Sequence, residues 1–233
     1  MKSQFSLKSW LIGCSMLAMT TTGAFAEVVY NRGNSADPES LDPHKTSTVY
    51  EANILRDLFM GLMVQDAKAQ VQPGAAESYS VSADGKTYSF ELRPGVKFAS
   101  GNALTAEDVV YSLQRAVQLD KTPAFILTQF GLTKDNVKDK IKQTGALTLT
   151  METDKSYAPT FVYNCLTANI ASIVDKKLLM SKEVGGDMGY GWLKTNYAGS
   201  GPLKLREWRA NEVIALERND NYWGEKSKLS RVI

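Results

Sequence analysis

The chain has 233 residues, of which 43% are apolar and 22% are charged, a composition typical of soluble globular proteins and not of disordered or fibrous ones. Its formal net charge is +2, and loss of Lys2 and Lys8 with the leader described below would reduce the 27 basic residues to 25, equal to the 25 acidic residues. A nearly neutral surface has no charge excess to attract nucleic acid or an anionic membrane, so neither partner is expected.

The first 26 residues have the pattern of a secretory signal peptide. Lys2 and Lys8 make its start positive, residues 10–19 are largely apolar, and Ala24-Phe25-Ala26 supplies a small-x-small cleavage pattern before Glu27. The apolar run is shorter than the roughly 20 residues that cross a membrane. We therefore expect an exported, periplasmic protein whose mature chain begins at Glu27.

The two cysteines bear on the leader and on redox chemistry. Leu11-Ile12-Gly13-Cys14 is similar to the lipobox of bacterial lipoproteins, and the alternative to cleavage after Ala26 is a lipid anchor at Cys14. Cys165 has no cysteine partner in the mature chain, so we expect neither an internal disulfide nor a cysteine metal site. Its simplest role is that of a small buried apolar residue, with a lone catalytic thiol as the alternative.

The first predicted elements are a short strand and a helix. A β-prone run at residues 28–30 precedes a polar loop over 31–43, in which two prolines exclude a helix. From Val49 to Leu62 apolar residues recur at three- and four-residue spacing, which predicts a helix that ends near Gly61. Residues 70–77 are predicted to form a loop.

A hairpin and a capped helix are predicted next. Asp84-Gly85 separates residues 79–82 from 87–92, where apolar and polar residues alternate, as in two strands joined by a tight turn. Thr105 followed by Asp108 is close to a capping box and begins an amphipathic helix.

The second half of the chain continues the mixture of strands and helices. Alternation over residues 147–152 predicts a half-buried strand, and Pro159 suits the first turn of a helix. The glycine-rich stretch 185–201 is predicted to be a long loop, followed by a strand pair at 203–208 and 213–218. The fold class is therefore mixed, α/β or α+β.

Several segments, in this order, resemble the peptide- and nickel-binding family of periplasmic substrate-binding proteins, family 5 of the bacterial extracellular solute-binding proteins. The matching segments are Ser40-Leu41-Asp42-Pro43-His44, Leu58-Phe59-Met60-Gly61-Leu62, residues 73–79, 84–98 and 101–112, Gly199-Ser200-Gly201-Pro202-Leu203, and residues 217–224. Together they span nearly all of residues 28–224, and the first segment is most similar to oligopeptide-binding members.

The resemblance implies a periplasmic binding protein type II-like lobe with an inserted accessory α+β domain. It assigns residues 27–55 and 169–233 to a discontinuous first lobe and residues 56–168 to the accessory domain. Family members are more than twice as long as this chain. The resemblance thus implies a truncated form that lacks the final strand of the first lobe and the C-terminal lobe, which carries the charged anchors for peptide termini.

The implied function is capture of peptides in the periplasm and their delivery to the permease subunits of an ABC importer in the inner membrane, by a monomer that closes about a hinge and needs no cofactor or metal. Nickel complexes, opines and oligosaccharides are alternative ligands, and a nonfunctional truncated product is a further alternative. An enzyme is not expected. A periplasmic hydrolase would need a nucleophile beside a base, whereas His44, the only histidine, follows Pro43 in a loop where we expect it to form a hydrogen bond.

Three stretches are candidate ligand contacts. The first is Ser47, Thr48 and Val49 at a predicted helix start, where free backbone N–H groups can meet ligand carbonyls. Matched to the similar oligopeptide binders, the contact with the peptide backbone falls on Ser47 and Val49. The alternative is that these residues only cap the helix.

Phe125 matches an aromatic residue of the accessory domain in those binders, a tyrosine there, so that only its packing would carry over. A buried position in the core is the simpler interpretation of Phe125. Ser200 and Gly201 could line the cleft, although a structural role in turning the backbone into the strand at Leu203 is the preferred interpretation.

Overall fold

The computed structural model describes residues 27–34, 36–45 and 48–233, and the predicted leader therefore lies outside the described residues. The strands are β1 (Val29–Tyr30), β2 (Met63–Gln65), β3 (Val71–Pro73), β4 (Ala76–Val81), β5 (Thr87–Leu92), β6 (Ile141–Gln143), β7 (Thr148–Glu152), β8 (Leu203–Arg209), β9 (Val213–Arg218) and β10 (Arg231–Val232). The helices are α1 (Val49–Leu58), α2 (Ala106–Leu119), α3 (Phe125–Thr128), α4 (Val137–Lys140), α5 (Pro159–Cys165), α6 (Lys176–Met180) and α7 (Tyr190–Leu193), with 3-10 turns η1 (Thr122–Ala124) and η2 (Asn169–Ala171).

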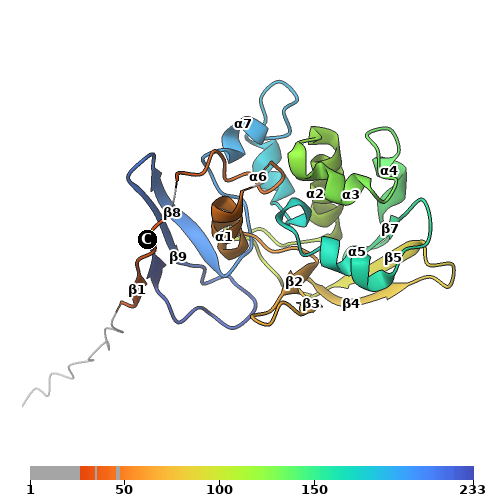
Figure 1. Cartoon of the computed structure of the whole chain (residues 1–233), viewed down its shortest axis with the longest axis horizontal. Helices are drawn as coiled ribbons and strands as arrows, with labels where there is room; N and C mark the ends of the chain where they lie inside the picture. The colour runs from red at the N-terminus through yellow and green to blue at the C-terminus, as the bar shows by residue number, and fades with distance from the viewer. Residues whose placement is uncertain (1–26, 35, 46–47) are drawn as a thin grey trace, which may run out of the picture.

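One sheet joins the two ends of the described chain. Its strand order is β1-β10-β9-β8, with β1 parallel to β10 and the remaining pairs antiparallel. Val29 pairs with Arg231, so residues about 200 positions apart in the sequence are neighbours. Helix α1 packs against this sheet, as Figure 1 shows, and Leu55 and Leu58 of the helix share a buried cluster with Leu203 and Leu216 of the strands.

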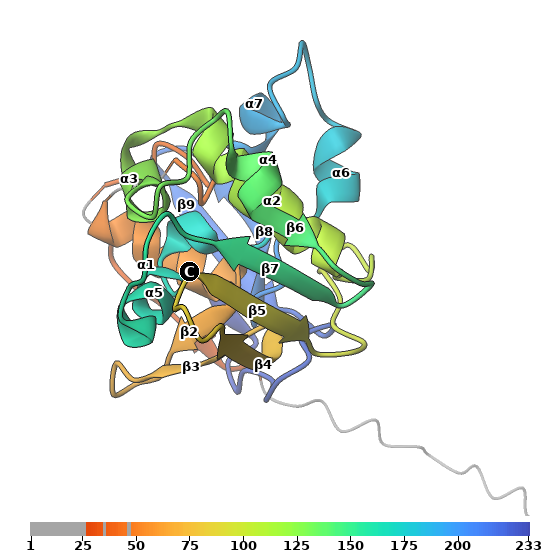
Figure 2. The ribbon, with the colours of Figure 1, turned by 90° about the vertical axis from the view of Figure 1, so that its right-hand side faces the viewer.

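A second sheet carries the predicted hairpin. Its strands are all antiparallel in the order β4-β5-β7-β6, and α2 lies across one face of it (Figure 2). Tyr88, Phe90 and Leu92 alternate along β5 and are buried, because every second side chain of a strand points to the same face. Helix α2 begins after Thr105, whose backbone N–H and hydroxyl both donate to Asp108 Oδ2, at 2.9 and 2.8 Å. The hairpin and the capped helix are thus confirmed.

The buried apolar side chains form two clusters. One runs from Met60 to Ile173 and surrounds the second sheet, and the other combines Leu41 and α1 with residues from Val174 onward. The chain passes from one cluster to the other at Phe59/Met60 and at Ile173/Val174, where Ile173 N–H donates to Met60 O at 2.9 Å. These crossings lie a few residues from the predicted boundaries after residues 55 and 168. The assignment of a lobe and an accessory domain stays a prediction.

Three predicted boundaries or elements differ from the structure. Helix α1 ends at Leu58 and not near Gly61, because Phe59 is already extended. Gly61 instead allows close approach of the backbone: a Cβ there would lie 3.1 Å from Leu166 O. The glycine-rich stretch 185–201 is not all loop, since it contains α7, and the predicted loop 70–77 contains β3 and the start of β4.

Candidate functional site

The predicted contact stretch lies where the polypeptide enters α1. Val49 is the first residue of the helix and its side chain is 79% exposed, while Ser47 lies outside the described residues. Thr48 occupies the N-cap position, but its side chain accepts no capping hydrogen bond. Its hydroxyl donates instead to Glu51 Oε2 at 2.6 Å. The alternative that Thr48 only caps the helix is therefore not supported by a capping hydrogen bond. The side chain of Val49 is accessible to a ligand.

A buried carboxylate holds this helix start against the preceding loop. Glu51 is almost completely buried, and its Oε1 accepts the backbone N–H of Glu39 at 2.7 Å while Oε2 accepts the Thr48 hydroxyl. On the solvent side of this contact, Lys45 forms an ion pair with Glu39, in which Lys45 Nζ lies 2.7 Å from Glu39 Oε2. The loop before α1 is thus tied to the first turn of the helix.

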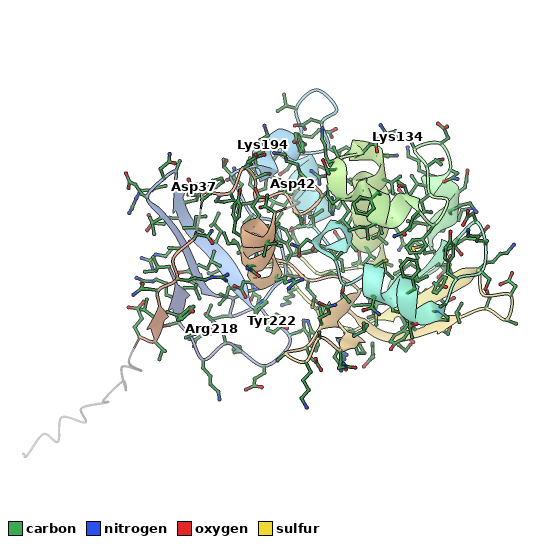
Figure 3. The ribbon with its side chains drawn as sticks, in the orientation of Figure 1. Asp37, Asp42, Lys134, Lys194, Arg218 and Tyr222 are labelled. Carbon is green, nitrogen blue, oxygen red and sulfur yellow. The ribbon has the colours of Figure 1, made fainter. Side chains whose placement is uncertain are left out.

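The other end of that loop is anchored by an internal ion pair. Arg115, from α2, donates from Nη1 to Asp42 Oδ1 at 3.0 Å and from Nη2 to Asp42 Oδ2 at 2.7 Å, and neither side chain is exposed to solvent. Figure 3 places Asp42 between α1 and α2, in the interior of the molecule. The same guanidinium donates from Nε to Met188 O at 2.9 Å. Such two-pronged pairing fixes direction as well as distance.

His44 extends this network. Arg115 Nη1 lies 2.8 Å from His44 Nδ1, and because a guanidinium only donates, Nδ1 must be the acceptor of a neutral imidazole. The proton is then on Nε2, which donates to Ser172 O at 3.0 Å. Burial, and secondly the charge of Arg115, lower the pKa of His44 to about 4. The loop hydrogen bond predicted for His44 is confirmed.

Phe125 is exposed and not part of the core. It begins α3, and 64% of its side chain is accessible, so the simpler interpretation of a buried phenylalanine is wrong. Two further exposed apolar side chains are Val49 of α1 and Phe161 of α5, the latter 43% exposed. Helices α1, α3 and α5 lie on one side of the molecule, at the left of Figure 2. We use the name apolar face for the three exposed side chains of Val49, Phe125 and Phe161, which are grouped only by the placement of their helices.

Ser200 and Gly201 lie beneath the end of α1. Both are buried, and Gly201 N–H donates to Leu58 O at 3.0 Å. A Cβ on Gly201 would lie 2.5 Å from Asp57 O, so only glycine allows the helix end to come this close. The hydroxyl of Ser200 has no hydrogen-bond partner among the described residues. These positions support the structural role preferred from the sequence and offer no accessible contact in this conformation.

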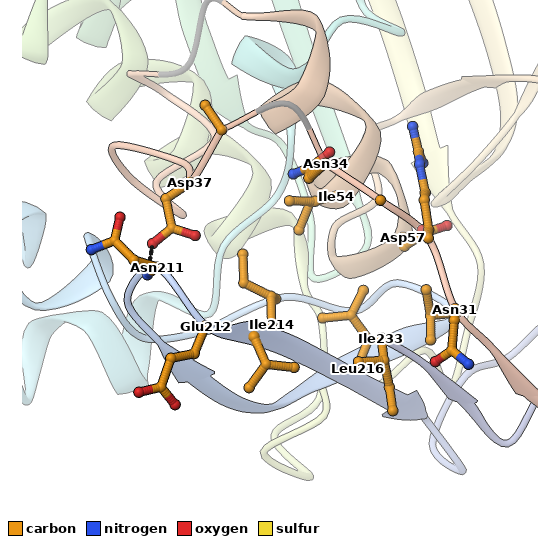
Figure 4. Close-up of a pocket in the computed structure, with 15 residues that line it drawn as sticks. Asn31, Asn34, Asp37, Ile54, Asp57, Asn211, Glu212, Ile214, Leu216 and Ile233 are labelled. Atoms are coloured by element: carbon orange, nitrogen blue, oxygen red, sulfur yellow. Dashed lines mark hydrogen bonds between the residues drawn. The ribbon is translucent and has the colours of Figure 1, made fainter.

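A cavity of about 650 Å³ lies elsewhere, between the loop after β1, helix α1 and strands β9 and β10 (Figure 4). Its apolar lining includes Ile54 of α1 and, across from it, Ile214 and Leu216 of β9, and its polar lining includes Asn34 and Asp37. Asp57 lines it, and burial raises the pKa of this carboxyl against an opposing effect of Arg32. The sequence did not single out this cavity, and the predicted contact residues among the described ones do not line it.

Cys165 is only partly buried, at the end of α5, whereas a buried position was expected for it. Burial raises the pKa of its thiol, and Gln129 Nε2 lies 3.6 Å from its Sγ. Within residues 27–34, 36–45 and 48–233, no helix has the length and apolar character needed to cross a bilayer. No group of three or more His, Cys, Asp or Glu side chains in the same ranges could hold a metal ion.

Comparison with known proteins identifies the family. The model of the bacterial extracellular solute-binding proteins, family 5 Middle, matches residues 70–233. The chain belongs to family 5 of the bacterial extracellular solute-binding proteins. The resemblance predicted from its ordered segments is therefore confirmed, as is the mixed α/β fold class.

Relatives of this family are similar in both sequence and structure. The periplasmic oligopeptide-binding protein OppA of Haemophilus influenzae is 33% identical over 198 residues, covering 83% of this chain and 36% of that protein. OppA of Escherichia coli is 35% identical over 202 residues, covering 82% of this chain and 36% of that protein.

Two solved structures show the same fold. H. influenzae OppA in complex with RPPGFSPFR superposes with a TM-score of 0.78 at 28% identity, covering 89% of this chain and 42% of that one. The E. coli murein tripeptide binding protein MppA gives 0.76 at 30% identity, with 89% and 42% covered. The chain thus spans little more than a third of the length of the curated relatives it matches.

Proposed function

We propose that this chain is part of the substrate-binding component of an ABC importer, which captures peptides in the periplasm and delivers them to permease subunits in the inner membrane. The observation that carries the proposal is the exposed start of α1, where Val49 follows a loop held by the buried Arg115–Asp42 ion pair and by the hydrogen bonds of the buried Glu51. A helix N-terminus whose first turn is held in place by Glu51 can present backbone N–H groups to peptide carbonyls at little entropic cost. The relatives named for oligopeptide and murein tripeptide binding support peptides as the ligand class.

The apolar face supplies a second element of the proposed site. Val49 and Phe125 would contact ligand side chains, and Phe125, which lacks a hydroxyl, would contribute packing alone. Peptides with apolar residues would gain about 25 cal/mol for each Å² of apolar surface removed from water. The opposing wall of a closed cleft would come from polypeptide that this chain does not contain, since it covers little more than a third of its relatives.

Binding is favoured over hydrolysis by the state of the two candidate catalytic side chains. His44, the only histidine, is buried and both of its ring nitrogens are engaged. The thiol of Cys165 has a raised pKa, whereas a nucleophilic cysteine needs a lowered one. We therefore propose a binding protein and not an enzyme. Its periplasmic location is proposed from the leader pattern and from the periplasmic relatives.

A nuclear magnetic resonance titration tests the proposed site, because it detects even weak binding. Residues 27–233 are titrated with a mixed library of di- to pentapeptides. We expect peptide-induced shifts at Thr48, Val49 and Phe125, and their loss in Val49→Asp. Val184→Asp is the matched control, because Val184 is 76% exposed, close to the exposed fraction of Val49, and lies between α6 and α7. Shifts that survive Val49→Asp, or no shifts at any accessible peptide concentration, would contradict the proposal.

A further inference from the structure

Two buried groups, Arg115 and Glu51, hold the described residues on either side of positions 46–47, just before α1. On the chain's N-terminal side, Asp42 and His44 are held by Arg115. On the C-terminal side, Glu51 holds both Glu39 and Thr48. Thr48 is held by Glu51, and Asp42 and His44 are held by Arg115, and both Glu51 and Arg115 are buried. Of these, Arg115 is the one that comes from a different part of the fold.

Arg115 connects the two hydrophobic clusters. Its neighbours on α2, Leu113 and Ala116, belong to the cluster around the second sheet, whereas Leu41, next to Asp42, belongs to the cluster around α1. Its Nε also holds Met188 O, which additionally accepts the Tyr111 hydroxyl at 3.3 Å. A single guanidinium thus fixes the loop before α1, helix α2 and the segment before α7 relative to one another.

We propose that Arg115 is a positioning residue for ligand binding, which sets the place of Thr48 and Val49 without touching the ligand. This inference rests on the proposed function of that stretch. The guanidinium meets both carboxylate oxygens of Asp42, His44 Nδ1 and Met188 O, at distances between 2.7 and 3.0 Å. A lysine ammonium carries the same charge but has no planar fork, so it cannot reach all four acceptors. The positive charge of a lysine would neutralise Asp42 and keep the chain folded. The planar guanidinium of Arg115 would, in addition, hold the loop before α1 in its position relative to α2.

The test compares Arg115→Lys with two controls in residues 27–233. Arg209→Lys makes the same chemical change at an exposed ion pair with Glu207 and Glu212. Leu149→Ala removes a buried side chain from the second sheet and lowers global stability without touching the loop. Two quantities are measured by nuclear magnetic resonance: amide exchange at Glu39 and Ala52, and the peptide-induced shift at Val49.

For Arg115→Lys we expect the amides of Glu39 and Ala52 to exchange roughly tenfold faster relative to the amide of Thr150 in the second sheet. This ratio reports local opening, because global unfolding would speed exchange at all three amides. We also expect a clear loss of the peptide-induced shift at Val49. Leu149→Ala, compared at equal residual stability, should show neither effect, and Arg209→Lys should match the unmodified chain.

The outcomes separate the inference from the function on which it rests. Unchanged exchange in Arg115→Lys, or an equal change in Leu149→Ala, overturns the positioning role. Faster exchange with an unchanged shift at Val49 also overturns it, because the loop would then move without affecting binding. Absence of a peptide-induced shift in the unmodified chain contradicts the proposed function, and the exchange data then decide on their own whether Arg115 positions the loop.

Discussion

Arg115 and Asp42 form a two-pronged ion pair in which neither side chain is exposed to solvent. Removal of one partner from such a pair leaves an uncompensated buried charge, which costs about 3–5 kcal/mol. We expect Asp42→Asn to lower the free energy of unfolding by about this amount, as measured by urea denaturation. The double variant Asp42→Leu with Arg115→Met should lose less, because it removes both charges. A single variant as stable as the unmodified chain would mean that water compensates the guanidinium.

His44 predicts a dependence of stability on pH. Its pKa is about 4 in the folded chain and 6.5 in the unfolded chain, so between these values only the unfolded state binds the proton. The stabilisation is complete above pH 6.5 and is lost as the pH falls toward 4, by on the order of 3 kcal/mol. In His44→Gln, urea midpoints measured from pH 7.5 to 4 should fall less steeply. Parallel curves for the two proteins would show that His44 has the same pKa in the folded and unfolded states.

Gly201 predicts a steric effect with an internal control. Because a Cβ there would lie 2.5 Å from backbone atoms of Asp57 and Leu58, Gly201→Ala must displace the end of α1. We expect a loss of about 1–3 kcal/mol, in the range of overpacked sites. Gly33→Ala, where a Cβ would have no neighbour within 4 Å, should change the thermal midpoint little. Equal effects of the two substitutions would refute the steric explanation.

Export makes a prediction about the mature N-terminus. The Ala24-Phe25-Ala26 pattern predicts cleavage before Glu27. Intact-mass spectrometry of protein recovered from the periplasm should therefore give a chain that starts at Glu27. A diacylglyceryl group on Cys14 would instead show that the lipoprotein alternative is correct.

Peptide affinity is expected to be low for this chain alone. A closed cleft buries most of a ligand and supplies polar partners from both sides, whereas the apolar face offers one wall. Calorimetric titration of residues 27–233 with di- to pentapeptides should give no saturable heat at micromolar concentrations. Micromolar or tighter binding by the folded monomer would show that the site lies entirely within these residues.

Local patterns in the sequence predicted much of the fold. The Asp84-Gly85 hairpin, the Thr105 capping box and the alternation in residues 147–152 each depend on neighbours in the sequence, and each is confirmed. Short elements such as β10 and α7 have no such local signal. They form because tertiary contacts hold them, as when β10 inserts between β1 and β9.

The candidate site was predicted less completely, because its geometry depends on distant partners. The family resemblance led to Ser47, Val49 and Phe125, and the predicted helix start led to Thr48, but neither Arg115 nor Glu51 was recognised. Arg115 had one usable signal: it occupies the apolar side of α2, between Leu113 and Ala116, where a charge needs a buried counter-charge. That Asp42 is its partner could be seen only in the fold, because 73 residues separate the two in the sequence.

The two chain crossings between the hydrophobic clusters have a consequence for the order of folding. Residues 60–173 hold the whole second sheet and can collapse as soon as they are available, because their pairings are comparatively local. Strand β1, by contrast, is synthesised before every other described strand and pairs with β10, the last of the described strands. The loop that this pairing closes spans nearly the entire described chain, and its closure has a high entropic cost. We therefore expect β1 and β10 to pair late in folding. The N-terminal strand, which directly follows the predicted export signal, must therefore wait unpaired until synthesis of these residues is finished.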